Sequence, residues 1–161
     1  MKYIKGYKLF ESTEIDFSEV EEYLIDFKHA GFKCKISYVT SLIIDWDKAN
    51  KEGKNLITSG QMDDYSAGIQ NKTLLIDLTS SDIISMEISD LENAFYMVYD
   101  YLRNEFNLSL NYIYINRHWD YLYYKDIDSV LNNIQSKNRI RTGQSQSSHK
   151  LEAHRISFGF K

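Results

Sequence analysis

Two segments of the chain, residues 16–39 and 90–113, each switch from helical periodicity to strand alternation. In the first segment, apolar residues follow a helical spacing and then alternate with polar ones: Phe17, Val20, Leu24 and Phe27, then Phe32, Cys34, Ile36 and Tyr38. In the second segment, the expected strand carries on one face Leu108, Leu110, Tyr112 and Tyr114. Because each unit joins a helix to a half-buried strand, we predict an α+β fold with two principal helices and a mainly antiparallel sheet.

Local signals mark where the two helices begin and end. Asp16 is the predicted N-cap of the first helix, Glu19 completes a capping box, and Gly31 supplies the left-handed stop. Ser89 and Glu92 form the corresponding box of the second helix. Apolar and alternating runs predict a third helix over 125–135 and strands over 41–46, 72–78, 82–88, 119–124 and 154–160. The polar stretches 47–72 and 136–150 predict long mobile loops.

The length of 161 residues is that of one domain, which we place at 12–161 with halves at about 12–70 and 71–161. The two helix-to-strand segments share four identities when aligned without gaps, Asp16/Asp90, Asp26/Asp100, Phe32/Phe106 and Tyr38/Tyr112. Duplication and a shared local pattern both explain this similarity. No apolar run approaches the ~20 residues that a membrane helix needs, so no membrane association is predicted.

Charge is distributed unevenly along the chain. Residues 1–128 hold 13 Lys/Arg against 22 Asp/Glu, whereas residues 129–161 hold six basic residues against one acidic residue. The basic segment is predicted to contact nucleic acid or an acidic partner, or to fold back on the acidic body, through Lys137, Arg139, Arg141, Lys150 and Arg155. On the first helix, a solvated acidic face available to a basic partner is predicted at Glu19, Glu21, Glu22 and Asp26.

Aromatic residues gather in one short part of the chain. Six of them fall within thirteen residues, at Tyr112, Tyr114, Trp119, Tyr121, Tyr123 and Tyr124. Rings presented together on a hairpin anchor protein interfaces and stack bases. The alternative is that Tyr112 and Tyr114 form the solvent-exposed edge of the core, because they share strand parity with Leu108 and Leu110. Parity makes the core-edge interpretation the stronger of the two.

Residues that carry catalysis in other proteins lack the expected context here. The lone Cys34 shares strand parity with Phe32 and Ile36, which predicts a small core residue rather than a nucleophile. The four histidines show none of the short spacings that build zinc sites, and no glycine-rich phosphate loop is present. We therefore predict a protein without enzymatic activity, cofactor or metal. A single cysteine also fits a reducing cytoplasm.

The opening peptide MKYIKGYKLFE resembles the capsid-targeting peptides of internal head proteins of large contractile-tailed bacteriophages. Such peptides start Met-Lys, carry aromatic residues and lysines, and end in Leu/Ile-x-Glu, as Leu9, Phe10 and Glu11 do here. The resemblance implies cleavage after Glu11, packaging in the virion interior and release into the host cytoplasm. The alternative is an ordinary first strand in which Tyr3, Lys5, Tyr7 and Leu9 alternate.

These observations lead to two functional hypotheses from different classes. The first is a phage accessory protein that binds a host or phage protein stoichiometrically, often a host defence protein, through the acidic helix face or the tyrosine-rich hairpin. The second is a nucleic-acid-associated or virion structural protein that uses the basic C-terminal segment. Salt dependence separates them, because charge-driven nucleic-acid binding weakens steeply as salt rises.

Overall fold

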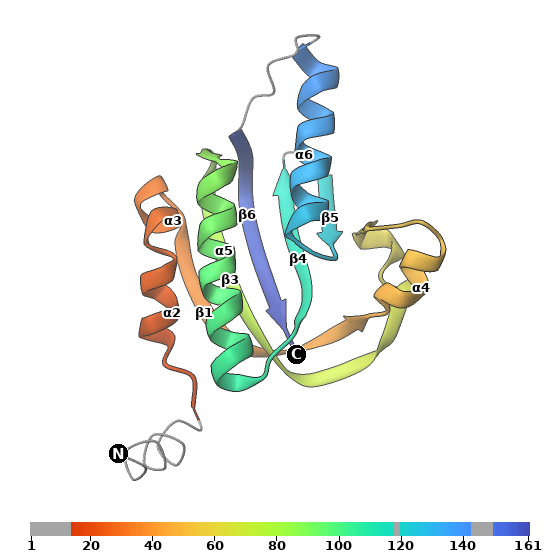
Figure 1. The fold of residues 1–161 in the computed structure, drawn as a ribbon, viewed down its shortest axis with the longest axis horizontal. Coiled ribbons are helices and arrows are strands. Elements are labelled where there is room, and N and C mark those ends of the chain that lie inside the picture. Colours follow the sequence, from red (N-terminus) through yellow and green to blue (C-terminus); the bar gives the residue numbers. More distant parts are fainter. Residues whose placement is uncertain (1–13, 118–119, 143–149) are drawn as a thin grey trace.

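The computed structural model describes residues 14–117, 120–142 and 150–161, with the side chains of 120 and 136–142 excepted. Figure 1 shows the chain coloured along its sequence. The opening peptide, with its predicted cleavage after Glu11, lies outside the described residues, as does Trp119. Both remain predictions from sequence.

Six antiparallel strands form one sheet, in the order β1-β3-β6-β4-β5-β2. The strands are β1 (Lys33–Ile44), β2 (Leu56–Thr58), β3 (Ser66–Glu87), β4 (Leu110–Arg117), β5 (Asp120–Tyr124) and β6 (Lys150–Phe160). The predicted α+β fold with an antiparallel sheet is confirmed. The last strand, β6, inserts between β3 and β4, so both halves of the sequence contribute to the same sheet.

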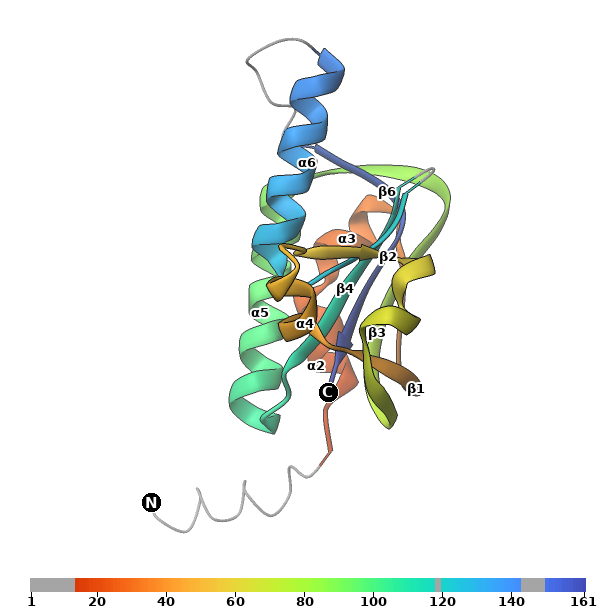
Figure 2. The same cartoon turned by 90° about the vertical axis from the view of Figure 1, so that its right-hand side faces the viewer.

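The described α-helices other than α4 (Trp46–Lys51) cover one face of this sheet, whereas α4 contributes to a second core (Figure 1). The helices are α2 (Phe17–Tyr23), α3 (Ile25–Ala30), α4 (Trp46–Lys51), α5 (Ile88–Phe106) and α6 (Ile127–Thr142). Figure 1 shows α2 and α3, then α5, then α6 side by side across the sheet, and Figure 2 shows α5 and α6 on one side of it. Within the described residues, no helix is long and apolar enough to cross a membrane.

The main core lies between the helices and the sheet. Apolar residues of α5 recur on one face and are buried, at Leu91, Ala94, Phe95, Val98 and Leu102. They meet the helix-facing side chains of the central strands, which include Ile76, Ile113, Ile156, Phe158 and Phe160, each with no exposed surface. The predicted strand at 154–160, with Ile156, Phe158 and Phe160 toward the core, is therefore confirmed.

The predicted helix boundaries are partly right. The Asp16 carboxylate accepts a hydrogen bond from the Ser18 backbone N–H at 2.9 Å, and Gly31 has a left-handed φ of 113°, as expected. The capping box is wrong, because the Glu19 carboxylate accepts from the Tyr23 hydroxyl instead. The predicted single helix is also interrupted at Leu24, where φ is −101° and ψ is 14°.

The predicted capping box of the second helix is also wrong. Strand β3 continues to Glu87 and α5 begins at the next residue, Ile88. Ser89 therefore already lies inside the helix and is not at its N-cap position. Glu87 occupies the cap position and makes no side-chain capping hydrogen bond. Because strand and helix are continuous in the chain, there is no loop in which a serine cap could act.

The first of the two predicted mobile loops is structured. Residues 47–72 contain most of α4, strand β2, the start of β3 and two 3-10 turns, η1 (Ser59–Gln61) and η2 (Asp63–Tyr65). A second, smaller core orders this region around Ile44, Ala49, Ile57, Tyr65 and Tyr112. Its apolar residues are too widely spaced in sequence to produce a periodic signal. In the second predicted loop, α6 continues through Thr142, and 143–149 lie outside the described residues.

Cys34 is half-buried against the main core, and burial raises the pKa of its thiol to about 11. Thiolate is the reactive form, so about 100-fold less of it is present at pH 8 than for a thiol of pKa 9. We expect labelling of native Cys34 by iodoacetamide at pH 8 to be about 100-fold slower than labelling in urea. Equal rates in the two conditions would show an accessible, activated thiol.

Candidate functional site

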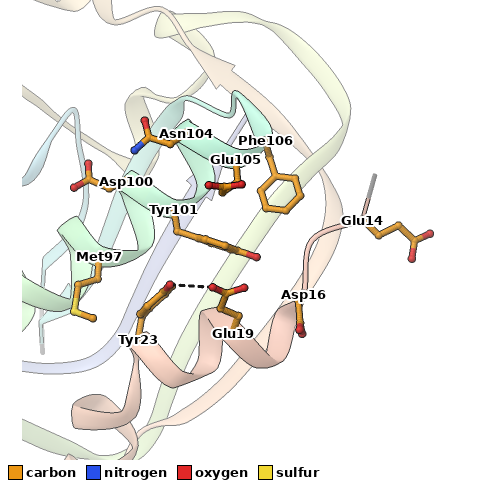
Figure 3. Close-up of a pocket in the computed structure, with 10 residues that line it drawn as sticks. All are labelled: Glu14, Asp16, Glu19, Tyr23, Met97, Asp100, Tyr101, Asn104, Glu105 and Phe106. Atoms are coloured by element: carbon orange, nitrogen blue, oxygen red, sulfur yellow. Dashed lines mark hydrogen bonds between the residues drawn. The ribbon is translucent and has the colours of Figure 1, made fainter. Parts of the chain in front are cut away.

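A cleft of about 810 Å³ lies between α2 and the second half of α5 (Figure 3). Five carboxylates line it, from Glu14, Asp16, Glu19, Asp100 and Glu105. Three aromatic rings lie between them, from Tyr23, Tyr101 and Phe106, and Met97 and Asn104 complete the lining. Within the described part of the chain, no basic residue lines the cleft.

Helical spacing brings these residues to one side of each helix. Glu19 and Tyr23 are four residues apart on α2 and so stand one above the other. On α5, one stripe runs along the outer face and consists of Met97, Asp100, Tyr101, Asn104 and Glu105. The opposite stripe of α5 is buried in the main core. The cleft is therefore held by two helices whose inner faces are fixed to the sheet.

The rings in the cleft contact one another edge to face. Tyr23 and Tyr101 have ring centroids 5.6 Å apart, and Tyr101 and Phe106 have centroids 5.4 Å apart. The Tyr23 hydroxyl donates to Glu19 Oε1 at 3.1 Å, as the dashed line in Figure 3 shows. Such edge-to-face pairs are worth ~1 kcal/mol beyond their buried area, so the rings form a preorganised surface.

Both phenols stay neutral well above physiological pH. Burial, with a further contribution from the neighbouring Glu19 carboxylate, raises the pKa of Tyr101 to about 12 and also raises the pKa of Tyr23. The negative charge of the cleft therefore resides on its carboxylates. Among the described residues, no group of His, Cys, Asp or Glu is arranged to hold a metal ion. Neutral ring faces beside carboxylates suit an organic cation.

The acidic residues predicted on the first helix do not form one surface. Glu19 turns into the cleft, and Glu21 makes an ion pair with Lys28. Glu22 and Asp26 are exposed outside the cleft. Sequence reasoning missed the contribution of α5, although Met97, Tyr101 and Glu105 follow the i, i+4, i+8 spacing of one helix face.

The tyrosines of the predicted hairpin lie on the sheet face opposite the helices. A register shift in β4 makes Asn111 a bulge, so Tyr112 and Tyr114 leave the face on which Leu110 packs. The parity argument therefore assigned these two tyrosines to the wrong face, although both do pack at the edge of a core, the second one. Tyr112 instead joins the second core at 8% exposure, while Tyr121 is 50% exposed.

The predicted basic segment is divided among different structural elements. Arg155 lies on β6 and makes two hydrogen bonds to the Asp77 carboxylate, from Nε at 2.7 Å and from Nη2 at 2.9 Å. Lys150 is exposed at the start of β6, opposite Glu87. The side chains of Lys137, Arg139 and Arg141 lie outside the described residues. Arg155 thus contacts the acidic body, one of the two predicted behaviours of this segment.

Comparisons of the chain with protein-family models, curated proteins and solved structures gave no match. Charge and geometry therefore provide the basis for a functional assignment. By these two criteria the cleft between α2 and α5 is the strongest site, because it combines a volume of about 810 Å³, rings in edge-to-face contact and charge of one sign. A smaller cavity of about 360 Å³, next to Trp46, Phe95 and Ile127, carries both lysine and aspartate in its lining.

Proposed function

We propose that this protein acts without catalysis, by binding a basic segment of a protein partner in the cleft between α2 and α5. The observation that carries the proposal is the lining itself: five carboxylates and three rings line the cleft, and no described residue of the lining is basic. A lysine or arginine side chain inserted there contacts ring faces and carboxylates together. Cation–π contacts contribute ~0.5–2 kcal/mol each, depending on how far the cation is desolvated.

A binding function is also favoured because the cleft contains no activated nucleophile among its described residues. Its phenols are held neutral, because burial raises the pKa of both Tyr23 and Tyr101. Cys34, the one thiol of the chain, lies on β1 and has a pKa raised to about 11. The carboxylates therefore act as fixed negative charges that attract and orient a cation.

The biological setting follows from the opening peptide. Because residues 1–11 resemble a capsid-targeting peptide, the proposed partner is a host or phage protein, and the proposed site of action is the host cytoplasm after release from the virion. Mass spectrometry of virion-derived protein that begins at Ser12 tests this part of the proposal.

Two exposed carboxylates of α5 provide the sharpest test of the cleft. We expect the double variant Asp100→Asn/Glu105→Gln to bind a fluorescein-labelled octa-arginine peptide about 10-fold more weakly than the unmodified chain, measured by fluorescence anisotropy. Both side chains are exposed, so thermal unfolding should be unchanged. The affinity of the unmodified chain should also fall as salt rises, because the contacts are ionic.

The matched control is Glu22→Gln/Asp26→Asn. It removes the same two negative charges from the first helical region, at exposed positions outside the cleft. We expect this control to keep its Kd within about 2-fold of the unmodified chain. If both double variants lose affinity equally, the peptide senses only net charge and the cleft is not its site.

A further inference from the structure

The sheet face opposite the helices carries three aligned rows of side chains. One row runs Lys33, Thr79, Arg155, Asn116 and Tyr121 across the strands β1, β3, β6, β4 and β5. The second runs Lys35, Asp77, Ser157, Tyr114 and Tyr123, and the third runs Ser37, Leu75, Gly159 and Tyr112. The tyrosines thus gather on β4 and β5, beside Arg155 on β6. We call this surface the tyrosine face.

The rings of the tyrosine face are packed close together around a fixed guanidinium. Tyr123 has its ring centroid 5.1 Å from that of Tyr112 and 4.9 Å from that of Tyr114. The Arg155 Cζ lies 5.7 Å from the Tyr114 ring centroid. Asp77 orients Arg155 through two hydrogen bonds and also accepts from Ser157 Oγ at 2.7 Å.

Several polar groups of this face have no hydrogen-bond partner among the described residues. The hydroxyls of Tyr112, Tyr114 and Tyr123 make no hydrogen bond to another described residue and are open to solvent. Burial raises the pKa of all three, so they remain protonated donors at neutral pH. Close by, the buried Asn116 Oδ1 is an acceptor without a donor. These solvent-facing donors and the one buried acceptor lie together on the tyrosine face, which therefore offers hydrogen-bonding groups to a ligand that carries both acceptors and donors.

Charge on the tyrosine face is opposite to that of the cleft. The three rows contain the exposed lysines Lys33 and Lys35 together with Arg155. Asp77 is the one carboxylate in these rows. The chain as a whole has a net charge of −4. A polyanion is therefore repelled by the helical side, where the cleft lies, and attracted to the tyrosine face.

We propose that the tyrosine face binds single-stranded nucleic acid, with phosphates held by the tyrosine hydroxyls, Arg155 and the lysines, and with a base stacked on the exposed ring of Tyr121. Phosphate oxygens accept from the phenols, while a base edge offers the N–H donors that Asn116 needs. Tyr121, at 50% exposure, presents the most accessible ring of the face. Aromatic platforms flanked by cations bind single strands in this manner without strict sequence preference. This proposal does not rest on the proposed function, because the two sites lie on opposite sides of the sheet.

A fluorescein-labelled 12-nucleotide oligothymidylate is the test probe, with binding followed by fluorescence anisotropy at low salt. We expect Tyr121→Ala to weaken binding about 5- to 100-fold, because it removes one stacking platform. Tyr114→Phe/Tyr123→Phe should also weaken binding, and it removes hydroxyls that make no internal hydrogen bond, so unfolding should be unchanged. Lys33→Gln/Lys35→Gln should reduce the slope of log K against log salt by about 1.4, or 0.7 for each lost phosphate contact.

Tyr38→Phe/Tyr96→Phe is the matched control, because it removes two hydroxyls at positions 44% and 39% exposed outside the tyrosine face. This control should bind the oligonucleotide like the unmodified chain. The proposal is overturned if the oligonucleotide does not bind, or if the control and the face variants lose affinity equally. It is also overturned if a duplex of the same length binds as tightly, since paired bases cannot stack on the rings, or if octa-glutamate binds in preference to the oligonucleotide.

Discussion

Removal of residues 150–161 should leave a chain that does not fold. Strand β6 lies inside the sheet and pairs with β3 on one side and β4 on the other, so its loss exposes two strand edges. It also removes four large side chains that are fully buried, Leu151, Ile156, Phe158 and Phe160. Their burial contributes roughly 6–12 kcal/mol, which is comparable to the ~5–15 kcal/mol stability of a typical domain. Circular dichroism in a urea series should show no cooperative transition.

A single substitution in β6 separates the effect of losing core side chains from the effect of losing the strand. Phe158→Ala keeps the backbone pairing of β6 but removes a ring whose centroid lies 5.5 Å from that of Phe95. We expect a cooperative transition destabilised by about 3–5 kcal/mol. If the truncated chain unfolded cooperatively at the urea midpoint of the full chain, the placement of β6 in the centre of the sheet would be wrong.

Asn111→Ala should destabilise the protein by about 3 kcal/mol, which is large for a polar residue. The Asn111 side chain is fully buried; its Oδ1 accepts from the Ile44 N–H at 3.0 Å and its Nδ2 donates to the Leu42 carbonyl at 2.9 Å. It thereby ties the end of β1 to the bulge in β4. Its removal leaves two backbone groups without their partner and creates a small cavity. Urea unfolding measures the effect directly.

Asn93→Ala is the matched control, because Asn93 is exposed in the middle of α5. Alanine is favoured in a helix, so this variant should stay within about 0.5 kcal/mol of the unmodified chain. Equal stability of the two variants would contradict the structural role assigned to Asn111. Because the bulge at Asn111 also turns Tyr112 toward the tyrosine face, the same variant should weaken oligonucleotide binding.

Local sequence patterns predicted the elements whose signals are periodic. The two predicted helices were found close to their expected starts, at Phe17 and Ile88, and the final strand was found with its inward-facing Ile156 and Phe158. The stop at Gly31 followed from its freedom to adopt a positive φ. These features depend on residues within a few positions of each other, which is the range over which a pattern is informative.

Features created by distant contacts could not be predicted in the same way. The bulge at Asn111 depends on Leu42 and Ile44, more than sixty residues away, and it reverses the faces of Tyr112 and Tyr114. The cleft depends on α2 packing beside α5, which brings Glu19 next to Tyr101. Sequence spacing identified Glu19 as a contact residue but grouped it with Glu22 and Asp26, which lie elsewhere. Tertiary packing determines which charges on a helix act together.

Amide chemical-shift mapping with unlabelled octa-arginine locates the bound basic segment on the protein and so tests its binding in the cleft between α2 and α5. In a titration of ¹⁵N-labelled protein, we predict that the largest shift changes fall in 16–23 and 97–106, the segments that line the cleft. They should disappear in the Asp100→Asn/Glu105→Gln variant and persist in Glu22→Gln/Asp26→Asn. Shift changes centred instead on residues 45–64, which carry five further carboxylates, or spread evenly over all exposed carboxylates, would show that the basic peptide does not bind in the cleft.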